Sequence, residues 1–274
     1  MALIADPPAG YRIEPVRAVT GGYLYARRFT SQCLGLSNHD LTDEPVEVGH
    51  NDIFVGLDWC ADFVFPSVKP WFLAQRRHGV RIVFVAYDML PLIRPELFPS
   101  LIPPIATDWN NTVAEVADCV ACISRTVTSE LCEWLCEAKL ERLRPLSLGY
   151  FHLGADLHAT LPTKGLSEDA FAILTKVRSR PSFLMVGTLE ARKGHRQAVD
   201  AMEQLWADKV DVNLVIVGNQ GWKTEDLVEQ IQRHPELNDR LFWLQGISDE
   251  MLEQLYRSAR ALRPLQKGKD SASR

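Results

Sequence analysis

The chain has 274 residues, of which 46% are hydrophobic and 24% are charged, and its formal net charge is -5. This composition is typical of a globular protein with enough chain for one large or two small domains, and we expect two. The negative charge gives no basic field for nucleic acid, so any bound anion must rely on a local group of Arg and Lys side chains.

Neither export nor membrane insertion is indicated by the sequence. Residues 1–10 lack the basic segment and the apolar segment of a signal peptide. The most apolar stretch, residues 81–93, is interrupted by Asp88 and Pro91, and it is shorter than the roughly 20 residues that span a bilayer. We therefore expect a cytoplasmic protein.

The six cysteines of the chain are expected to be reduced thiols rather than a disulfide framework. Cys119, Cys122, Cys132 and Cys136 form a CxxC followed by a CxxxC, and four thiolates could bind zinc. The alternative, which we favour, is that they pack as small apolar side chains in a strand and a helix. No Asp-X-Asp occurs to present a divalent ion, so no metal is expected. No GxGxxG follows a predicted strand and no GxxxxGK(S/T) occurs, so no dinucleotide or P-loop cofactor is expected either.

The first half of the chain alternates between strand and helix patterns only after an N-terminal stretch, residues 1–50, that shows no sustained period. The patterns predict strands at 52–58, 81–87, 119–123 and 146–153, and helices at 68–78, 107–117 and 125–139. Residues 91–104 contain five prolines and are expected to form a loop. Ser124 or Thr126 is a candidate N-cap for the last of these helices.

The second half has the clearer alternation. It predicts strands at 183–187, 212–218 and 241–245, and helices at 196–206, 224–233 and 249–261. Three successive β-α units imply a parallel sheet with right-handed crossovers. A fourth strand should follow, but the polar tail from Arg263 cannot form a core strand. The predicted fold class is α/β with two Rossmann-like lobes, at residues 1–158 and 182–274, and a polar linker at residues 159–181.

One loop of the second lobe has the pattern of a phosphate site. An apolar strand ends at Gly187, the adjacent cations Arg192 and Lys193 follow, and Gly194 precedes a helix. Backbone N–H groups at a helix N-terminus and nearby cations bind anions, although such a pair is often only solvated charge. His195 is expected to be a polar residue at the start of the helix rather than a catalyst.

Short segments in a fixed order carry a resemblance to a known family. In the second lobe these are Val186-Gly-Thr-Leu-Glu-Ala-Arg-Lys-Gly194, Leu214-Val-Ile-Val-Gly218, Phe242-Trp-Leu-Gln-Gly246 and residues 249–256. In the first lobe they are Tyr87-Asp88-Met-Leu-Pro-Leu, Ala121-Cys-Ile-Ser124 and Leu153-Gly-Ala-Asp156. Their order and spacing resemble the GT-B glycosyltransferases of family 4, also called group 1 glycosyltransferases.

The resemblance implies a retaining transfer of a hexose, such as mannose, from a nucleotide diphosphate sugar to a glycan or lipid-linked glycan acceptor in polysaccharide biosynthesis. Peripheral membrane association is compatible with such an acceptor. Asp88 would be catalytic and face the transferred sugar. The donor-binding residues implied are Gly187, Thr188, Arg192, Lys193, Gly218, Gly246 and Ile247.

Three departures from the family weaken this expectation. Thr188 replaces an Arg that many members have, and Tyr87 replaces a His. The family's Glu-Gly-Phe-Gly-Leu-Pro segment, which holds the sugar, does not follow Tyr256. The alternative function is therefore a catalytically dead remnant or a nucleotide-sugar binding module.

The tail suggests an origin for the missing segment. A DNA string that encodes Lys267-Gly-Lys-Asp-Ser-Ala-Ser-Arg274 encodes Gly-Glu-Gly-Phe-Gly-Leu-Pro in a shifted frame, so we expect a frameshift just before Lys267. No glycine-rich β-α unit precedes residue 52, and we expect a chain truncated at both ends. An uncovered strand edge in the second lobe would favour self-association.

Overall fold

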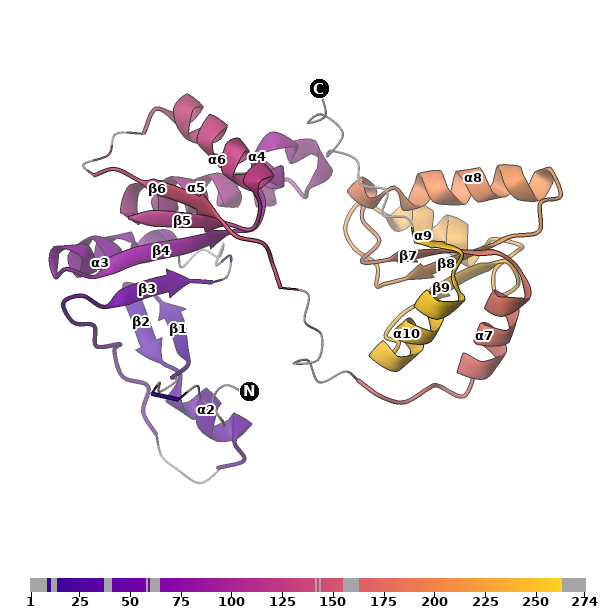
Figure 1. The fold of residues 1–274 in the computed structure, drawn as a ribbon, viewed down its shortest axis with the longest axis horizontal. Helices are drawn as coiled ribbons and strands as arrows, with labels where there is room; N and C mark the ends of the chain where they lie inside the picture. The colour runs from indigo at the N-terminus through magenta and orange to yellow at the C-terminus, as the bar shows by residue number, and fades with distance from the viewer. Residues whose placement is uncertain are drawn as a thin grey trace. The chain divides into compact units, whose positions relative to one another are not determined.

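The computed structural model describes residues 9–10, 14–36, 41–57, 59, 65–140, 142, 144–154 and 163–262. The chain divides into two compact units, one formed by Met1–Pro95 with Ser100–Gly154 and the other by Glu96–Pro99 with Ala155–Arg274. Each unit contains a parallel sheet of four strands covered by helices (Figure 1). The expected α/β class with two Rossmann-like lobes is confirmed.

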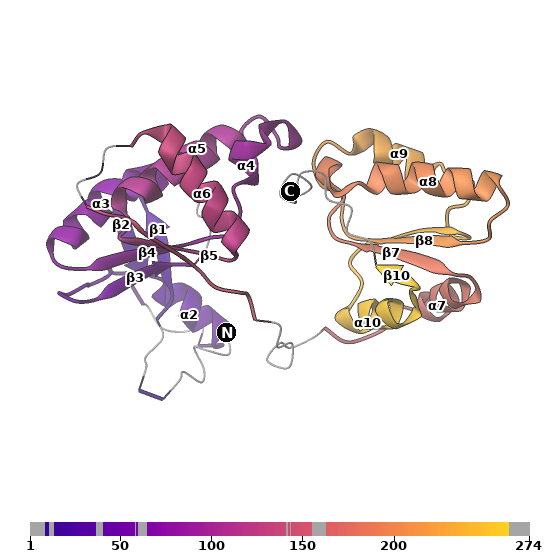
Figure 2. The ribbon, with the colours of Figure 1, turned by 45° about the horizontal axis from the view of Figure 1, so that its top comes forward.

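The first unit is built on a sheet of order β3-β4-β5-β6 with all neighbours parallel. Its strands are β3 (Ile53–Gly56), β4 (Arg81–Ala86), β5 (Cys119–Cys122) and β6 (Ser147–Tyr150). Its long helices are α3 (Phe65–Arg77), α5 (Ile102–Val116) and α6 (Arg125–Ala138). All three helices lie on one face of the sheet and share one core with Ile82 and Phe84 (Figure 2). The predicted strands and helices of this unit are confirmed to within a few residues, apart from α5, which begins five residues before its expected start.

An N-terminal hairpin that the sequence pattern did not predict packs beside this sheet. It consists of β1 (Val16–Val19) and antiparallel β2 (Gly22–Tyr25), followed by helix α2 (Arg27–Cys33). The ring of Tyr23 is 9% exposed and lies 5.2 Å from Phe54 and 5.1 Å from Trp71, centroid to centroid. The hairpin lies in the stretch without a sustained period, and this cluster of rings from distant segments anchors it.

The proline-rich stretch is not the continuous loop expected from the sequence. It contains helix α4 (Leu90–Ile93) and a short 3-10 helix, η1 (Pro95–Leu97), and α5 begins at Ile102. Proline is tolerated in the first helical turn because its missing N–H would have no partner there. Pro91 and Pro103 occupy such positions in α4 and α5, and this explains the error.

The second unit is a doubly wound sheet of order β10-β7-β8-β9. Its strands are β7 (Ser182–Val186), β8 (Asn213–Val217), β9 (Leu241–Leu244) and β10 (Ala261–Leu262). Helices α8 (His195–Ala207) and α9 (Glu225–Gln232) cover one face, and α7 (Ala170–Ser179) and α10 (Asp249–Ser258) cover the other (Figure 2). The predicted parallel β-α units are confirmed.

A fourth strand does follow α10, in contrast to the expectation that the tail replaces it. β10 pairs in parallel with β7 through two residues before the polar tail begins. The tail from Arg263, on which the frameshift hypothesis rests, lies outside the described residues, as do residues 1–8.

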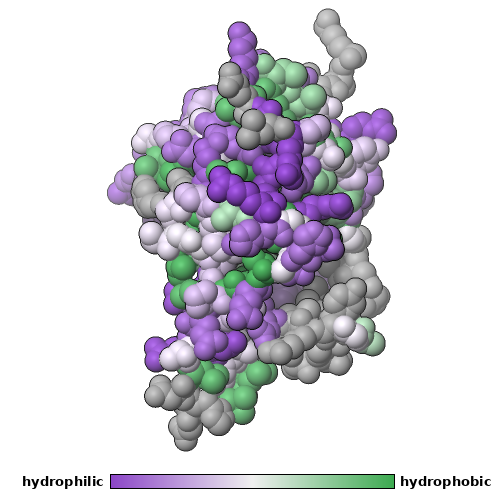
Figure 3. Space-filling model, turned by 90° about the vertical axis from the view of Figure 1, so that its left-hand side faces the viewer, coloured by the Kyte–Doolittle hydropathy of each residue, from purple (hydrophilic) through white to green (hydrophobic). Residues whose placement is uncertain are grey.

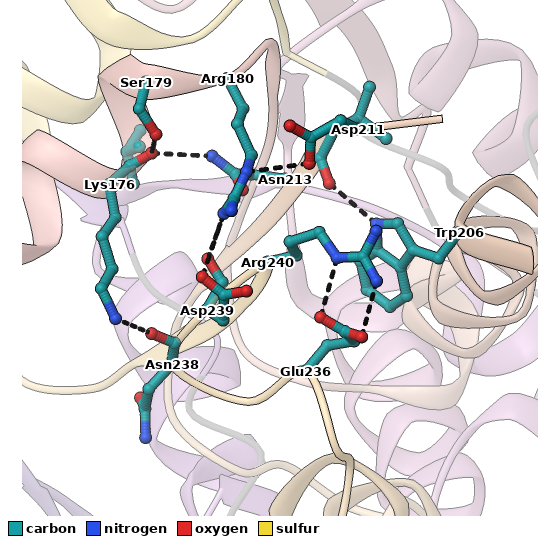
Figure 4. A network of polar contacts seen from close by, with 12 residues as sticks. Lys176, Ser179, Arg180, Trp206, Asp211, Asn213, Glu236, Asn238, Asp239 and Arg240 are labelled. Atoms are coloured by element: carbon teal, nitrogen blue, oxygen red, sulfur yellow. Dashed lines mark hydrogen bonds and ion pairs between the residues drawn. The ribbon is translucent and has the colours of Figure 1, made fainter. Parts of the chain in front are cut away.

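Polar side chains tie α7 to the amino-terminal edge of this sheet (Figure 4). Arg180 pairs with Asp211 at 2.9 Å and with Asp239 at 3.1 Å, just before β8 and β9. Lys176 donates to the carbonyl of Asn238 at 2.6 Å, and Asn213 donates to the carbonyl of Lys176 at 3.1 Å. A short helix at residues 169–176 was one expectation for the predicted linker, and α7 is that helix, three residues longer at its C-terminal end and part of the second unit.

The surface of one face of the molecule mixes polar and apolar side chains (Figure 3). Edge strand β3 contributes exposed apolar residues, with Ile53 60% and Val55 46% exposed. Among the described residues, no helix is both long and apolar enough to cross a membrane.

Candidate functional site at the carboxyl edge of the second sheet

The loop after β7 has the expected strand, loop and helix geometry. β7 ends at Val186, the 3-10 helix η2 spans Ala191–Lys193, and α8 starts at His195. Gly194 precedes α8 with φ 69°, and no side chain caps this helix. The first N–H groups of α8 therefore lack a side-chain acceptor, which is the condition under which a helix start binds an anion.

Glycines let this loop lie directly against the loop that follows β8. Gly218 has φ 150°, and a Cβ on it would lie 2.2 Å from the carbonyl oxygen of Gly187. A Cβ on Gly221 would lie 2.5 Å from the carbonyl oxygen of Leu189. Leu189 donates to Asn219 at 2.9 Å and Gly221 donates to Leu189 at 2.9 Å, so the β7–β8 pairing continues into the loops. Gly218 and Gly221 are thus required by contact between two backbones, whatever else approaches them.

A buried carboxylate organises the two cations of the loop. Glu190 is 5% exposed, and its Oε2 lies 2.7 Å from Nε of Arg192. Its other oxygen lies 3.6 Å from Nζ of Lys193. The Lys193 side chain covers Gly187, because a Cβ there would meet Nζ at 3.1 Å. The three charges sum to one positive charge beside the glycine-lined strand ends. The role of Glu190 was not recognised from the sequence, in which it is one acid among many.

His195 is a buried, neutral part of the same cluster. It is 2% exposed, and its Nδ1 has no hydrogen-bond partner among the described residues. Burial, and then the nearby charge of Lys193, lower its pKa from 6.5 to about 4. A neutral imidazole leaves the positive charge of the site to Arg192, Lys193 and the helix start. In the sequence, only the position of His195 directly after Gly194 indicated that it belongs to this cluster.

The loop between β9 and α10 lies at the same edge of the sheet. Gly218 donates to the carbonyl of Leu244 at 2.9 Å, and the indole of Trp243 donates to the carbonyl of Gly218 at 2.9 Å. Gly246 is exposed with φ 61°, whereas Ile247 packs toward the core with Met251. A ligand at this loop would therefore contact backbone at Gly246 rather than the side chain of Ile247.

The structure brings six of the eight expected site residues together at this edge: Gly187, Thr188, Arg192, Lys193, Gly218 and Gly246. Ile247 follows on the same loop with its side chain inward. Asp88 belongs to the first unit, after β4, and its Oδ1 accepts from the N–H of Leu90 at 3.0 Å. That contact is an Asx turn, which is a local role for Asp88, and its catalytic role stays a prediction.

The cysteines do not form a metal site within the described residues. Cys119 and Cys122 lie on β5, and Cys132 and Cys136 on α6. The expectation that all four pack as small apolar side chains is wrong for Cys132 and Cys136, which are exposed; of the four, only Cys122 is buried. No group of three or more His, Cys, Asp or Glu side chains that could hold a metal ion occurs in the described part of the chain. Desolvation raises the pKa of Cys122, as expected of a thiol packed as a small apolar side chain.

Two comparisons by sequence find similar proteins. Residues 167–263 match the family model of glycosyl transferases group 1. The chain is also 40% identical, over 264 residues, to a serotype-specific mannosyltransferase WbdA of Escherichia coli. Over these residues the chain is therefore similar in sequence to group 1 glycosyltransferases. It covers 32% of the length of that mannosyltransferase and 31% of another WbdA of the same organism, which is also 40% identical, so it spans about a third of these relatives.

Solved structures are similar at a lower level. An α,α-trehalose 6-phosphate synthase from Burkholderia multivorans matches 80% of this chain with a TM-score of 0.49 and 12% identity, over 52% of its own length. HepE from Anabaena, in complex with UDP and glucose, matches 77% of the chain with a TM-score of 0.49 and 17% identity, over 51% of its own length.

Proposed function

We propose that the second unit binds the diphosphate of a nucleotide diphosphate sugar at the start of α8. The observation that carries this proposal is the cluster of Arg192 and Lys193 around buried Glu190, beside the glycine-lined ends of β7 and β8. Ligands of open α/β sheets bind beyond the carboxyl ends of the strands, and this cluster lies there. No metal or cofactor takes part in the proposal.

The reaction we propose is a retaining transfer of a hexose, with mannose as the sugar, to a glycan acceptor in polysaccharide biosynthesis. The match of residues 167–263 to the family model supports glycosyl transfer, and the name of the similar WbdA proteins supports mannose. Breaking the bond between the sugar and the diphosphate leaves negative charge on the phosphate oxygens. Fixed cations and helix N–H groups stabilise such charge as it develops.

Four further expectations from the sequence stay predictions: the catalytic role of Asp88, a cytoplasmic location, peripheral membrane association and self-association through a sheet edge.

The first experiment measures binding of UDP, GDP and ADP to the purified chain by calorimetry. We expect one nucleoside diphosphate to bind, and Lys193→Ala to weaken it about tenfold or more, because a charge-assisted contact to phosphate is lost. Arg233→Ala is the matched control, since this cation is exposed on α9 near the opposite edge of the sheet and pairs only with Glu229 among the described residues. Equal affinities in all three proteins would overturn the proposal.

A second measurement separates the two candidate functions. The chain is incubated with the matching nucleotide sugar and a mannose-containing glycan, and the products are analysed by mass spectrometry. Addition of a hexose supports the transferase. Binding of the nucleotide without transfer supports the nucleotide-sugar binding module.

A further inference from the structure

Residues Glu96–Pro99 belong to the second unit, although the residues on either side of them belong to the first. They pack close to Arg192 and its neighbours. The indole N–H of Trp222 donates to the carbonyl of Leu97 at 3.1 Å, and Nζ of Lys223 donates to the carbonyl of Glu96 at 2.9 Å. Two side chains of the β8–α9 loop therefore fix the backbone of this segment.

These bonds place the ring of Phe98 against Trp222. Phe98 is 8% exposed, and the ring centroids are 6.1 Å apart with an interplanar angle of 30°. This separation is within the range of offset aromatic pairs. Phe98 is thus buried and oriented by a partner that is itself held by a hydrogen bond.

The other neighbour of Phe98 is Arg192. The guanidinium carbon of Arg192 lies 6.0 Å from the ring centroid of Phe98, at the outer limit of a cation–π contact. Nε of Arg192 also lies 2.7 Å from Oε2 of Glu190. Arg192 therefore contacts both a carboxylate and an aromatic ring, and its side chain is only 18% exposed. Lys193 has no such aromatic neighbour among the described residues.

We propose that Phe98, supported by Trp222, is a positioning residue that holds the Arg192 guanidinium in place for the donor diphosphate. The identity of the ligand rests on the proposed function, whereas the contact between Phe98 and Arg192 does not. A long side chain that is ordered before the ligand arrives loses less rotamer freedom on binding. The aromatic support therefore raises affinity without touching the ligand.

A double-mutant cycle tests this coupling. Phe98→Ala is combined with Arg192→Ala, and binding of the nucleoside diphosphate is measured for the four proteins by calorimetry. We expect Phe98→Ala to weaken binding about threefold to tenfold when Arg192 is present, and by less than about 1.5-fold when it is absent. An equal loss in both backgrounds, or no loss in either, would overturn the proposal.

Further variants separate positioning from loss of packing. Phe98→Leu keeps a buried apolar side chain without the aromatic face, and we expect it to bind like Phe98→Ala. Phe98→Tyr keeps the face and should restore affinity. Phe171→Ala removes a phenyl ring that is 81% exposed on α7, and it should bind like the unaltered chain. If Phe98→Leu binds like the unaltered chain, the aromatic face is not what matters.

A ligand-free readout keeps this inference distinct from the proposed function. NMR of the Arg192 side-chain Nε–H in the free chain should show an ordered group, and Phe98→Leu should make it mobile on the ps–ns timescale. If no nucleoside diphosphate binds but this change is seen, the proposed function fails and the positioning contact stands. An Arg192 signal that is equally mobile in both proteins refutes the contact.

Discussion

The two edges of the second sheet handle charge in opposite ways. At the amino edge, Arg180 pairs with Asp211 and Asp239, whose side chains are 65% and 55% exposed. At the carboxyl edge, the Glu190 side chain is 6% exposed and faces two cations. Exposed pairs stay hydrated and contribute little, whereas a buried charge is costly unless it is matched. The ion pairs at the amino edge therefore only connect α7 to the sheet, whereas the carboxyl edge keeps one unmatched positive charge where we propose that the donor diphosphate binds.

Substitution at the backbone contact between Gly187 and Gly218 should lower the stability of the chain more than the other changes described below. Gly218→Ala places a Cβ 2.2 Å from the carbonyl oxygen of Gly187, so the two loops must separate. We expect the free energy of unfolding, from urea titration, to fall by more than about 3 kcal/mol. Gly246→Ala is the control, because a Cβ there meets no described atom within 4 Å and only the backbone strain at φ 61° remains, about 1 kcal/mol. Equal losses would show that the close approach of the loops is unimportant.

Acid should destabilise the carboxyl edge through His195. Its pKa is lowered to about 4 in the folded chain, so the unfolded chain binds the proton more readily. The contribution is fully present above pH 6.5 and is lost as the pH falls toward 4. At about 1.4 kcal/mol per pKa unit, the loss is on the order of 3 kcal/mol.

The measurement for this prediction is urea unfolding of the chain and of His195→Gln at several pH values between 7 and 4. The variant should be less stable at pH 7 but should lose less stability on acidification. Parallel pH profiles for the two proteins would refute a role of this imidazole.

Removal of the Glu190 carboxylate should lower the free energy of unfolding by less than Gly218→Ala does, but by more than removal of an exposed carboxylate does. Glu190→Gln keeps the shape of the side chain and leaves Arg192 and Lys193 without their anion. We expect a loss of about 2 kcal/mol, measured by urea unfolding. Glu253→Gln, at an exposed pair with Arg257 on α10, should cost no more than about 0.5 kcal/mol. A loss as small for Glu190→Gln would mean that Glu190 is effectively solvated.

Substitution at the amino edge should have the smallest effect on stability. Arg180→Gln removes two exposed ion pairs, and its partners can be hydrated in the variant. We expect a loss below about 1 kcal/mol and no change in nucleoside diphosphate affinity. An effect on affinity would contradict the separation of the two edges.

Prediction from the sequence succeeded where the local pattern is strong. The second unit alternates apolar strands with amphipathic helices. Of the two candidate caps of α6, Ser124 is the one observed, and its Oγ accepts from the N–H of Val127. Prediction failed at β1 and β2, whose position depends on contacts of Tyr23 with distant aromatic rings. It also failed around Pro91 and Pro103, because a proline that ends one helix can begin another.

The sequence by itself determined the α/β class, the parallel pairing of β7, β8 and β9, and the loop that carries Arg192 and Lys193, because periodicity and glycine spacing are local properties. Tertiary structure decided which groups surround those cations. Phe98 lies far from Arg192 in the sequence, Gly218 is required by the backbone of Gly187, and the burial of Glu190 and His195 depends on packing of the whole unit. Burial and contact between distant segments are set only when the chain folds, and they give these side chains their charge and position.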